Sequence, residues 1–168
     1  MLDTKIKKPF GSWPSVVTPQ LVSAAALGLN YIQSNSDHLF WVENRPWEAG
    51  RNVILSRTAE GFIEELLPSP YSHYSRVHEY GGMAYAVTDD MLYFVNAADQ
   101  CIYQLALNKD SQPVAITNCG TRFADLVVDN KNNRLIAVCE RHVDGLEPEN
   151  YLAVIAIGDN NSQAQKLV

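Results

Sequence analysis

Short apolar runs, each preceded by a polar turn, recur along the chain. The clearest are residues 38–43, 91–96 and 134–140, which follow Asp37, the pair Asp89–Asp90 and the Asn-rich stretch 129–133. Aromatic and β-branched runs of this length after a turn signal predict β-strands. A second apolar run follows each of them, and further runs precede the second and the third, at 83–87 and 123–128. The pattern therefore predicts an all-β chain of many short strands.

The strand pattern repeats. Aligning Phe40, Tyr93 and Ile136 gives spacings of 53 and 43 residues, with a strand–turn–strand–loop–strand order in each unit. Units of ~40–50 residues that hold four short strands are typical of β-propeller blades. A β-sandwich, the alternative for many short strands, does not repeat one phrase at this distance. We predict a partial β-propeller of about three four-stranded blades, at approximately residues 30–75, 76–120 and 121–168.

The first 29 residues form a separate N-terminal segment in this interpretation. Thr18 can cap a helix, Pro19 suits its first position, and good helix formers continue to Leu27 before Gly28. This order of capping residue, proline, helix formers and glycine predicts one short N-terminal helix.

Three blades do not close a ring, which takes at least ~4. An open arc exposes unpaired strand edges, and proteins normally avoid such edges. We therefore expect the arc to be incomplete at its C-terminus. It is either part of a longer protein or closes by self-association through its open strand edges.

Composition narrows the class of protein. The chain is 46% hydrophobic with a net charge of −6, which indicates a globular protein and argues against a nucleic-acid partner. No apolar run approaches the ~20 residues of a membrane span, and the first residues lack a signal-peptide core. We expect a cytoplasmic protein with no membrane partner. The three cysteines, Cys101, Cys119 and Cys139, are odd in number and form no CxxC pair, so we expect buried, reduced thiols.

Motifs of complete catalytic or metal sites are missing from the sequence. No serine lies in a Gly-x-Ser-x-Gly nucleophile elbow. The metalloprotease pattern begins at His78–Glu79 but has Gly82 where the second histidine must stand. Residues 129–140 resemble a calcium loop only at their ends, because Lys131 and Arg134 occupy its third and sixth positions. We expect no catalytic residue, no metal and no cofactor.

The stretch from Ser75 to Tyr85 gathers ionisable and aromatic residues before two glycines, Gly81 and Gly82. Glycines at this place predict a close approach of backbones. Two interpretations of Arg76 and Glu79 stay open. They bind a ligand, or they pair with the backbone or with each other to hold the start of the second blade.

A second group of polar residues follows matching strands. Glu43, Asn44 and Arg45 end a strand of the first blade, and Arg141 and His142 end the corresponding strand of the third. Matching positions at one end of several blades predict a shared rim, where binding residues commonly lie. Aromatic residues nearby, Tyr80 among them, are more often part of the packing.

Four stretches together resemble the N-terminal region of bacterial serine peptidases of the prolyl oligopeptidase family. They are residues 11–15 (GSWPS), 76–82 (RVHEYGG), 124–129 (ADLVVD) and 134–138 (RLIAV). Within the family they are similar to the branch of dipeptidyl aminopeptidases and acylaminoacyl peptidases. The matches occur in the right order between Gly11 and Ile157, and residues 77–82 are the most specific.

The resemblance implies a seven- or eight-bladed propeller that covers an α/β-hydrolase domain with a Ser-Asp-His triad. This chain corresponds to about the first three blades and stops before the triad, so it is expected to be inactive alone. Its implied role is to control the access of peptides to the hydrolase active site and their positioning there. The residues implied for gating, or for holding a peptide terminus, are Arg76, His78, Glu79, Tyr80, Glu43 and Arg45.

Two other interpretations remain. The chain could be a free-standing scaffold for protein interaction that closes by self-association. It could also be a metal-dependent lactonase propeller, with Asp99, Asp125 and Glu79 as ligands.

Overall fold

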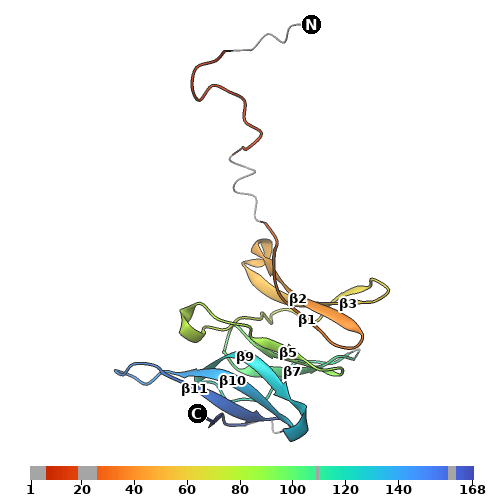
Figure 1. The fold of residues 1–168 in the computed structure, drawn as a ribbon, viewed down its shortest axis with the longest axis vertical. Helices are drawn as coiled ribbons and strands as arrows, with labels where there is room; N and C mark the ends of the chain where they lie inside the picture. Colours follow the sequence, from red (N-terminus) through yellow and green to blue (C-terminus); the bar gives the residue numbers. More distant parts are fainter. Residues whose placement is uncertain (1–6, 19–25, 109, 159–161) are drawn as a thin grey trace.

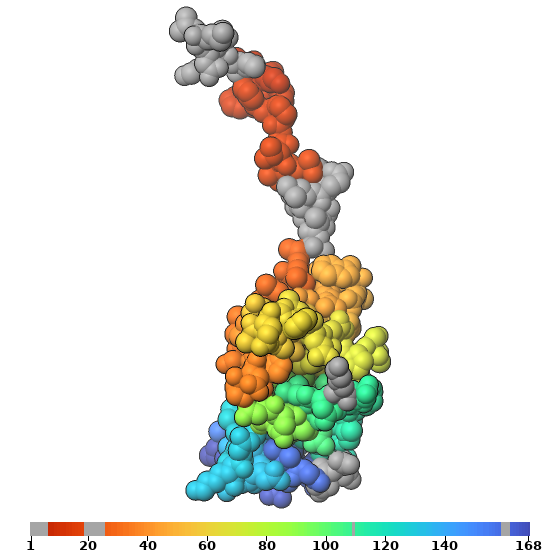
Figure 2. Space-filling model, turned by 90° about the vertical axis from the view of Figure 1, so that its right-hand side faces the viewer, coloured from red at the N-terminus to blue at the C-terminus, as the bar shows by residue number. Residues whose placement is uncertain are grey.

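A computed structural model describes residues 7–18, 26–108, 110–158 and 162–168. Within these ranges, twelve strands form three antiparallel four-stranded sheets, each built from four strands consecutive in the chain. In Figures 1 and 2 the three sheets are stacked in chain order. The first sheet holds β1 (Gly28–Ser34), β2 (His38–Arg45), β3 (Arg51–Thr58) and β4 (Ile63–Glu65). The second holds β5 (Tyr85–Val87), β6 (Met91–Val95), β7 (Ile102–Ala106) and β8 (Val114–Ala115). The third holds β9 (Thr121–Asp129), β10 (Arg134–Arg141), β11 (Glu149–Ala156) and β12 (Gln165–Lys166).

The predicted repeat is visible in the second strand of each sheet. Strands β2, β6 and β10 begin at His38, Met91 and Arg134, which reproduces the spacings of the sequence repeat. Each follows a turn after the first strand of its sheet, which lies at the edge of that sheet. The all-β prediction and its four-stranded units are therefore confirmed.

The second sheet is buried on both faces, because successive side chains of a strand point to opposite sides. Along β6, Leu92 and Phe94 join a core with Phe40 and other residues of the first sheet. Tyr93 and Val95 join a second core with residues of the third sheet. Two hydrophobic cores thus hold three layers together.

The predicted N-terminal helix falls largely on residues 19–25, which lie outside the described residues. Gly28, expected to end that helix, is the first residue of β1. Among the described residues, the helical segments are three short 3₁₀ turns, η1 (Pro46–Glu48), η2 (Val77–Glu79) and η3 (Asn130–Asn132). None of the described helices has the length and apolar character needed to cross a bilayer.

The prediction of three reduced cysteines is wrong for two of them. Cys101 and Cys119 form a disulfide with their Cα atoms 5.3 Å apart, whereas Cys139 is free and buried as expected. The pairing of β7 with β8 brings the two residues together. Past the last paired residues of these two strands, the amide of Ile102 donates a hydrogen bond to Thr117 Oγ1 at 2.9 Å. The hairpin therefore continues toward the positions of Cys101 and Cys119.

Candidate functional site

Glu140, near the end of β10, is a buried carboxylate with only 3% of its surface exposed. Its Oε2 accepts a hydrogen bond from the backbone N–H of His78 at 2.7 Å. Its Oε1 accepts one from Arg122 Nη1 at 3.0 Å and lies 2.5 Å from His142 Nε2. A carboxylate is buried at acceptable cost only with such partners. Glu140 is thus the centre of what we call the Glu140 cluster: His78, Glu79, Arg122, Glu140 and His142.

Two neighbouring strands bring the charges together. Arg122 in β9 lies directly opposite Glu140 in β10. The same Nη1 of Arg122 lies 2.5 Å from Glu79 Oε1 and donates to the carbonyl oxygen of Arg76 at 2.9 Å. One guanidinium therefore connects the third sheet to the segment that contains η2.

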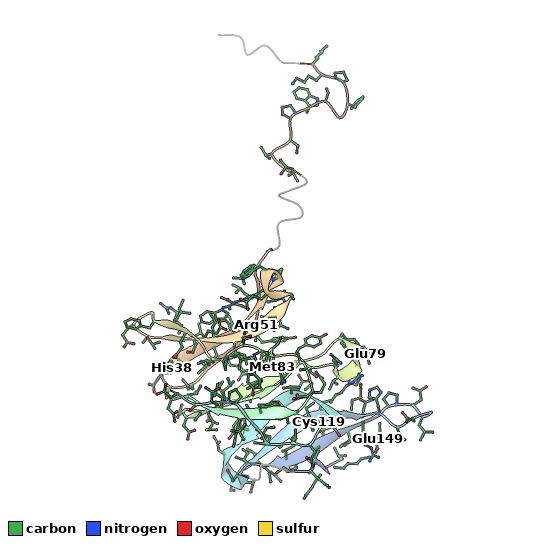
Figure 3. All side chains as sticks on the ribbon, turned by 180° about the vertical axis from the view of Figure 1, so that it is seen from behind. His38, Arg51, Glu79, Met83, Cys119 and Glu149 are labelled. Atoms are coloured by element: carbon green, nitrogen blue, oxygen red, sulfur yellow. A yellow bond between two sulfur atoms is a disulfide. The ribbon has the colours of Figure 1, made fainter. Side chains whose placement is uncertain are left out.

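The backbone around η2 is unusual, and it presents Glu79 outward. His78 and Glu79 have φ angles of 53° and 65°, a region that residues other than glycine seldom occupy. Gly81 has a φ of 80°, and a Cβ there would lie 2.7 Å from the carbonyl oxygen of Ser75. The close backbone approach predicted for the glycines is therefore confirmed at Gly81, whereas Gly82 lies close to the side chains of Asp125 and Ala124. Glu79 points away from this support, with its side chain 74% exposed (Figure 3).

The electrostatics of the cluster favour the charged form of Glu140. Burial raises the pKa of Glu140, but hydrogen bonds from His142 and the His78 amide, together with the charge of Arg122, outweigh burial and lower it. The hydrogen bond to Glu79, partly opposed by burial, raises the pKa of Arg122. The cluster therefore holds two carboxylates for one guanidinium, and the exposed one, Glu79, is able to bind a cationic group.

Two further predicted residues, Arg76 and Tyr80, lie beside the cluster. Arg76 is exposed, and its backbone N–H donates to Gln100 Oε1 at 2.7 Å. In the described part of the chain the partner of Glu79 is Arg122 and not Arg76. Tyr80 is 80% exposed, with its ring centroid 6.0 Å from that of His78. Tyr80 and His78 thus form an exposed aromatic pair, with one residue on each side of Glu79 in the chain.

Glu43 and Arg45 lie elsewhere, in an ion-pair network of the first sheet. Arg45 contacts Glu43, Glu48 and Glu65 at 3.0, 3.1 and 2.7 Å. Arg51 contacts Glu48 and Glu65 at 2.6 and 2.7 Å. We call these five residues the Arg45–Arg51 network.

The ends of β2 and β10 and the turn η2 lie toward the same end of the stacked sheets (Figure 1). The Arg45–Arg51 network and the Glu140 cluster therefore share one rim.

A metal ion does not fit the Glu140 cluster. Ligand atoms of Glu79, Glu140 and His142 lie within 4.8 Å of one another, which is a suitable spacing. Nη1 of Arg122, however, hydrogen-bonds both carboxylates and supplies the positive charge that an ion would bring. The set considered for a lactonase metal is not assembled either: Asp99 and Glu79 belong to different groups, and Asp125 accepts a hydrogen bond from the Met83 amide.

Arg122 and Glu140, which organise the cluster, were not among the residues predicted from the sequence. The sequence carries only part of the signal for them. The runs 123–128 and 134–140 flank the turn 129–133, but counting back along such a hairpin pairs Glu140 with Phe123. A register shift between Ile136 and Val138 places Arg122 opposite Glu140 instead.

Comparison with known proteins relates this arrangement to peptidases. No protein-family model matches the chain, and no curated protein sequence matches it. A solved structure of a Mycobacterium tuberculosis puromycin-hydrolyzing peptidase matches with a TM-score of 0.81 and 28% sequence identity, over 98% of this chain. This chain matches the propeller region of a prolyl oligopeptidase family peptidase. The resemblance found in the sequence is therefore confirmed.

Two further structures of this family agree. A puromycin hydrolase matches with a TM-score of 0.75 and 27% identity over 88% of this chain. A puromycin hydrolase mutant complexed with PGG matches with a TM-score of 0.72 and 27% identity over 89% of this chain. The chain spans only 28%, 24% and 25% of the length of the three structures, which supports a non-catalytic domain of a peptidase.

Proposed function

We propose that this chain forms the propeller portion of a serine peptidase and controls how peptides reach and lie at an α/β-hydrolase active site that the chain itself does not carry. The similarity to puromycin-hydrolysing peptidases supports the peptidase class. The observation that carries the positioning role is the exposed carboxylate of Glu79, held at the rim by Arg122.

In this proposal Glu79 binds the positively charged amino terminus of a peptide. Its carboxylate retains free acceptor positions, because one guanidinium is shared with Glu140. His78 and Tyr80 border it and would contact the first side chain of the peptide. Arg76, exposed nearby, would contact carbonyl or carboxylate groups. Glu43 and Arg45 remain predicted rim residues, although their ion pairs favour a structural role.

The test is kinetic and uses the peptidase that contains this chain. Glu79→Gln is expected to raise KM at least about 10-fold for peptides with a free amino terminus, because a charge-assisted hydrogen bond is lost. The same substitution should leave N-acetylated peptides unaffected. Glu64→Gln, on the exposed strand β4, is the matched control and should change neither. An equal effect of Glu79→Gln on both kinds of peptide would contradict the proposal.

A second experiment addresses the absence of catalysis. The chain alone is expected to hydrolyse no aminoacyl nitroanilide after contaminating proteases are removed. A burst of product that titrates with the chain would overturn the non-catalytic assignment.

Self-association is a second proposal, and one observation favours it. The first sheet carries an open hollow of about 400 Å³ lined by Leu29, Ile32, Leu39 and Trp41 among others. Exposed apolar surfaces of this kind mark interaction sites. Light scattering coupled to size-exclusion chromatography should then show a multimer that Ile32→Asp, at a side chain 72% exposed, dissociates; a monomer at all concentrations would exclude it.

A further inference from the structure

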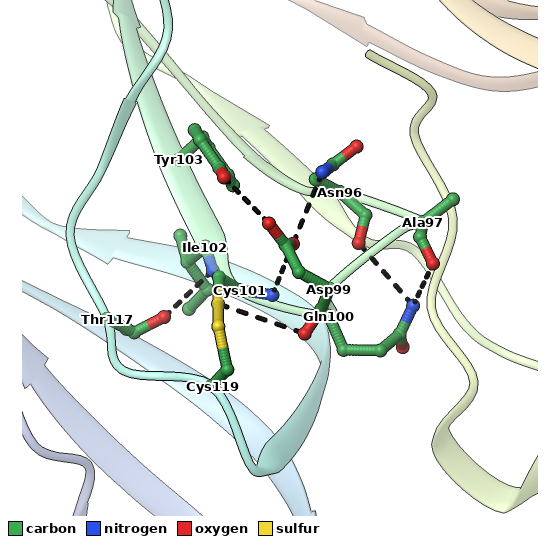
Figure 4. The surroundings of a disulfide bond; sticks show 9 residues. All are labelled: Asn96, Ala97, Asp99, Gln100, Cys101, Ile102, Tyr103, Thr117 and Cys119. Carbon is green, nitrogen blue, oxygen red and sulfur yellow. Dashed lines mark hydrogen bonds between the residues drawn. A yellow bond between two sulfur atoms is a disulfide. The ribbon is translucent and has the colours of Figure 1, made fainter. Parts of the chain in front are cut away.

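The disulfide of the second sheet has a carboxylate beside it. Cys101 and Cys119 join the turn between β6 and β7 to the loop between β8 and β9. Asp99 lies in the same turn, and its Oδ1 accepts a hydrogen bond from the Cys101 amide at 3.1 Å (Figure 4). The ligand atoms of Asp99, Cys101 and Cys119 lie within 4.8 Å of one another.

The two sulfur atoms are bonded to each other in the structure, so a metal site can form only after reduction, when the thiolates separate. Zn²⁺ binds thiolate sulfur at about 2.3 Å and carboxylate oxygen at about 2.0–2.2 Å, which places neighbouring ligand atoms roughly 3.5–4 Å apart. Two thiolates select a thiophilic ion over Ca²⁺ or Mg²⁺. Cys101 is 2% exposed, whereas Cys119 is exposed, so a fourth ligand can come from water.

The carboxylate is held in position by other side chains. Asp99 Oδ2 accepts a hydrogen bond from the hydroxyl of Tyr103 at 2.7 Å, and Asn96 Nδ2 donates to Oδ1 at 3.2 Å. Partners of this kind orient a ligand before a metal arrives.

We propose that Asp99, Cys101 and Cys119 form a site for Zn²⁺ or a similar thiophilic divalent cation when the disulfide is reduced. The disulfide is first reduced to two thiols, either by a dithiol that supplies two electrons and two protons and becomes a disulfide, or by a phosphine that supplies two electrons and becomes its oxide while water supplies the two protons. The cation then displaces one proton from each thiol as two metal–sulfur bonds form. Oxidation and metal binding exclude each other, and each joins the same two loops.

The site sits next to the segment that supports the Glu140 cluster. Gln100, the neighbour of Cys101, accepts a hydrogen bond from the Arg76 amide and donates one to the carbonyl of Tyr74 at 3.2 Å. Cys119 is followed closely by Arg122. Either the disulfide or the metal would therefore fix the two chain segments that lead to the Glu140 cluster, one at Gln100 and one just before Arg122.

The test titrates Zn²⁺ against a chromogenic chelator, with the whole chain reduced by a phosphine under anaerobic conditions. The reduced chain is expected to bind one equivalent, and the oxidised chain none. Cys101→Ser, Cys119→Ser and Asp99→Asn should each weaken binding by at least about 10-fold, since even outer-shell partners contribute that much. Cys139→Ala is the matched control, because Cys139 is buried in the third sheet, and it should bind as the wild type does.

A second measurement does not depend on the folding of variants. Cd²⁺ added to the reduced wild-type chain should produce an ultraviolet thiolate-to-metal charge-transfer band with the intensity of two thiolates. The proposal is overturned if that band is missing. It is also overturned if the reduced chain binds Zn²⁺ no more tightly than the oxidised chain or the Cys101→Ser/Cys119→Ser double variant does.

Discussion

Two groups of charged residues lie on the rim, and they differ in how their charges are satisfied. In the Arg45–Arg51 network, Glu48 and Glu65 each contact both arginines, and no side chain is more than 36% exposed. In the Glu140 cluster, one arginine serves two carboxylates whose side chains are 4% and 74% exposed. In the Arg45–Arg51 network, the charged groups are paired with one another. The Glu140 cluster buries one charge in order to present another, which is the arrangement expected of a binding group.

The largest expected effect on stability is the loss that the buried histidine His73 causes at acidic pH. This loss has to be measured first, because at low pH it adds to any loss from the carboxylates of the two groups. Burial lowers the pKa of His73 from 6.5 to about 3. The unfolded chain therefore takes up a proton below pH 6.5 while the folded chain does not, and stability falls with pH down to about 3. The loss reaches roughly 4–5 kcal/mol at most.

Urea unfolding at several pH values from about 7 down to about 4 measures this loss. His73→Gln should flatten the dependence, because it removes the group that takes up a proton in the unfolded chain only. The loss that remains in His73→Gln then belongs to carboxylates such as Glu65 and Glu140, and it should begin only below about pH 4.5. An unchanged slope in His73→Gln would disprove this assignment.

Removing the buried carboxylate has the next largest effect. Glu140→Ala leaves the His78 amide and Arg122 without their buried acceptor, and should lower the free energy of unfolding by about 3 kcal/mol. Glu140→Gln, which keeps the shape, should cost less. Both are measured by urea unfolding at neutral pH. A loss for Glu140→Ala below that of an exposed glutamate such as Glu64 would contradict the central role of this residue.

The Arg45–Arg51 network is expected to tolerate substitution better. Arg45→Met removes one cation from three carboxylates, but Arg51 still contacts Glu48 and Glu65, so the expected loss is about 1–2 kcal/mol. High salt should reduce the difference from wild type. Because the network and the cluster share no residue, the losses of Arg45→Met and Glu140→Ala should add in the double variant.

The smallest effect on stability is expected at Glu79. Its pair with Arg122 is largely exposed to solvent, so Glu79→Gln should cost less than about 1 kcal/mol. Thermal unfolding of the chain measures this value. If Glu79→Gln destabilises the chain as much as Glu140→Ala does, Glu79 is a structural residue and the contrast between the two groups disappears.

Much of the fold could be predicted from local pattern. The turns before His38, Met91 and Arg134 and the apolar runs after them specify hairpins, and the recurrence of such hairpins specifies repeated four-stranded sheets. The glycines Gly81 and Gly82 also marked a real close approach. Each of these features depends on residues that are close together in the chain, so a single sequence is enough to recognise it.

The parts that were missed depend on contacts across strands. The disulfide joins residues 18 positions apart that meet only because β7 pairs with β8, and no spacing motif marks such a pair. Arg76 and Glu79 are close in the chain, yet the left-handed turn at His78 directs Glu79 toward Arg122 of another sheet. The register of the strands and the left-handed backbone conformation at His78 decide these partners. Neither can be read from the amino-acid composition or from local patterns.

The two-sided burial of β6 limits how this protein can vary. A shift of one residue in that strand would exchange Leu92 and Phe94 with Tyr93 and Val95, and both cores would lose their fit at once. Insertions and deletions among natural variants should therefore collect in the turns that precede β2, β6 and β10. The lengths and registers of the strands should then stay constant among natural variants, and the turns between strands should vary in length.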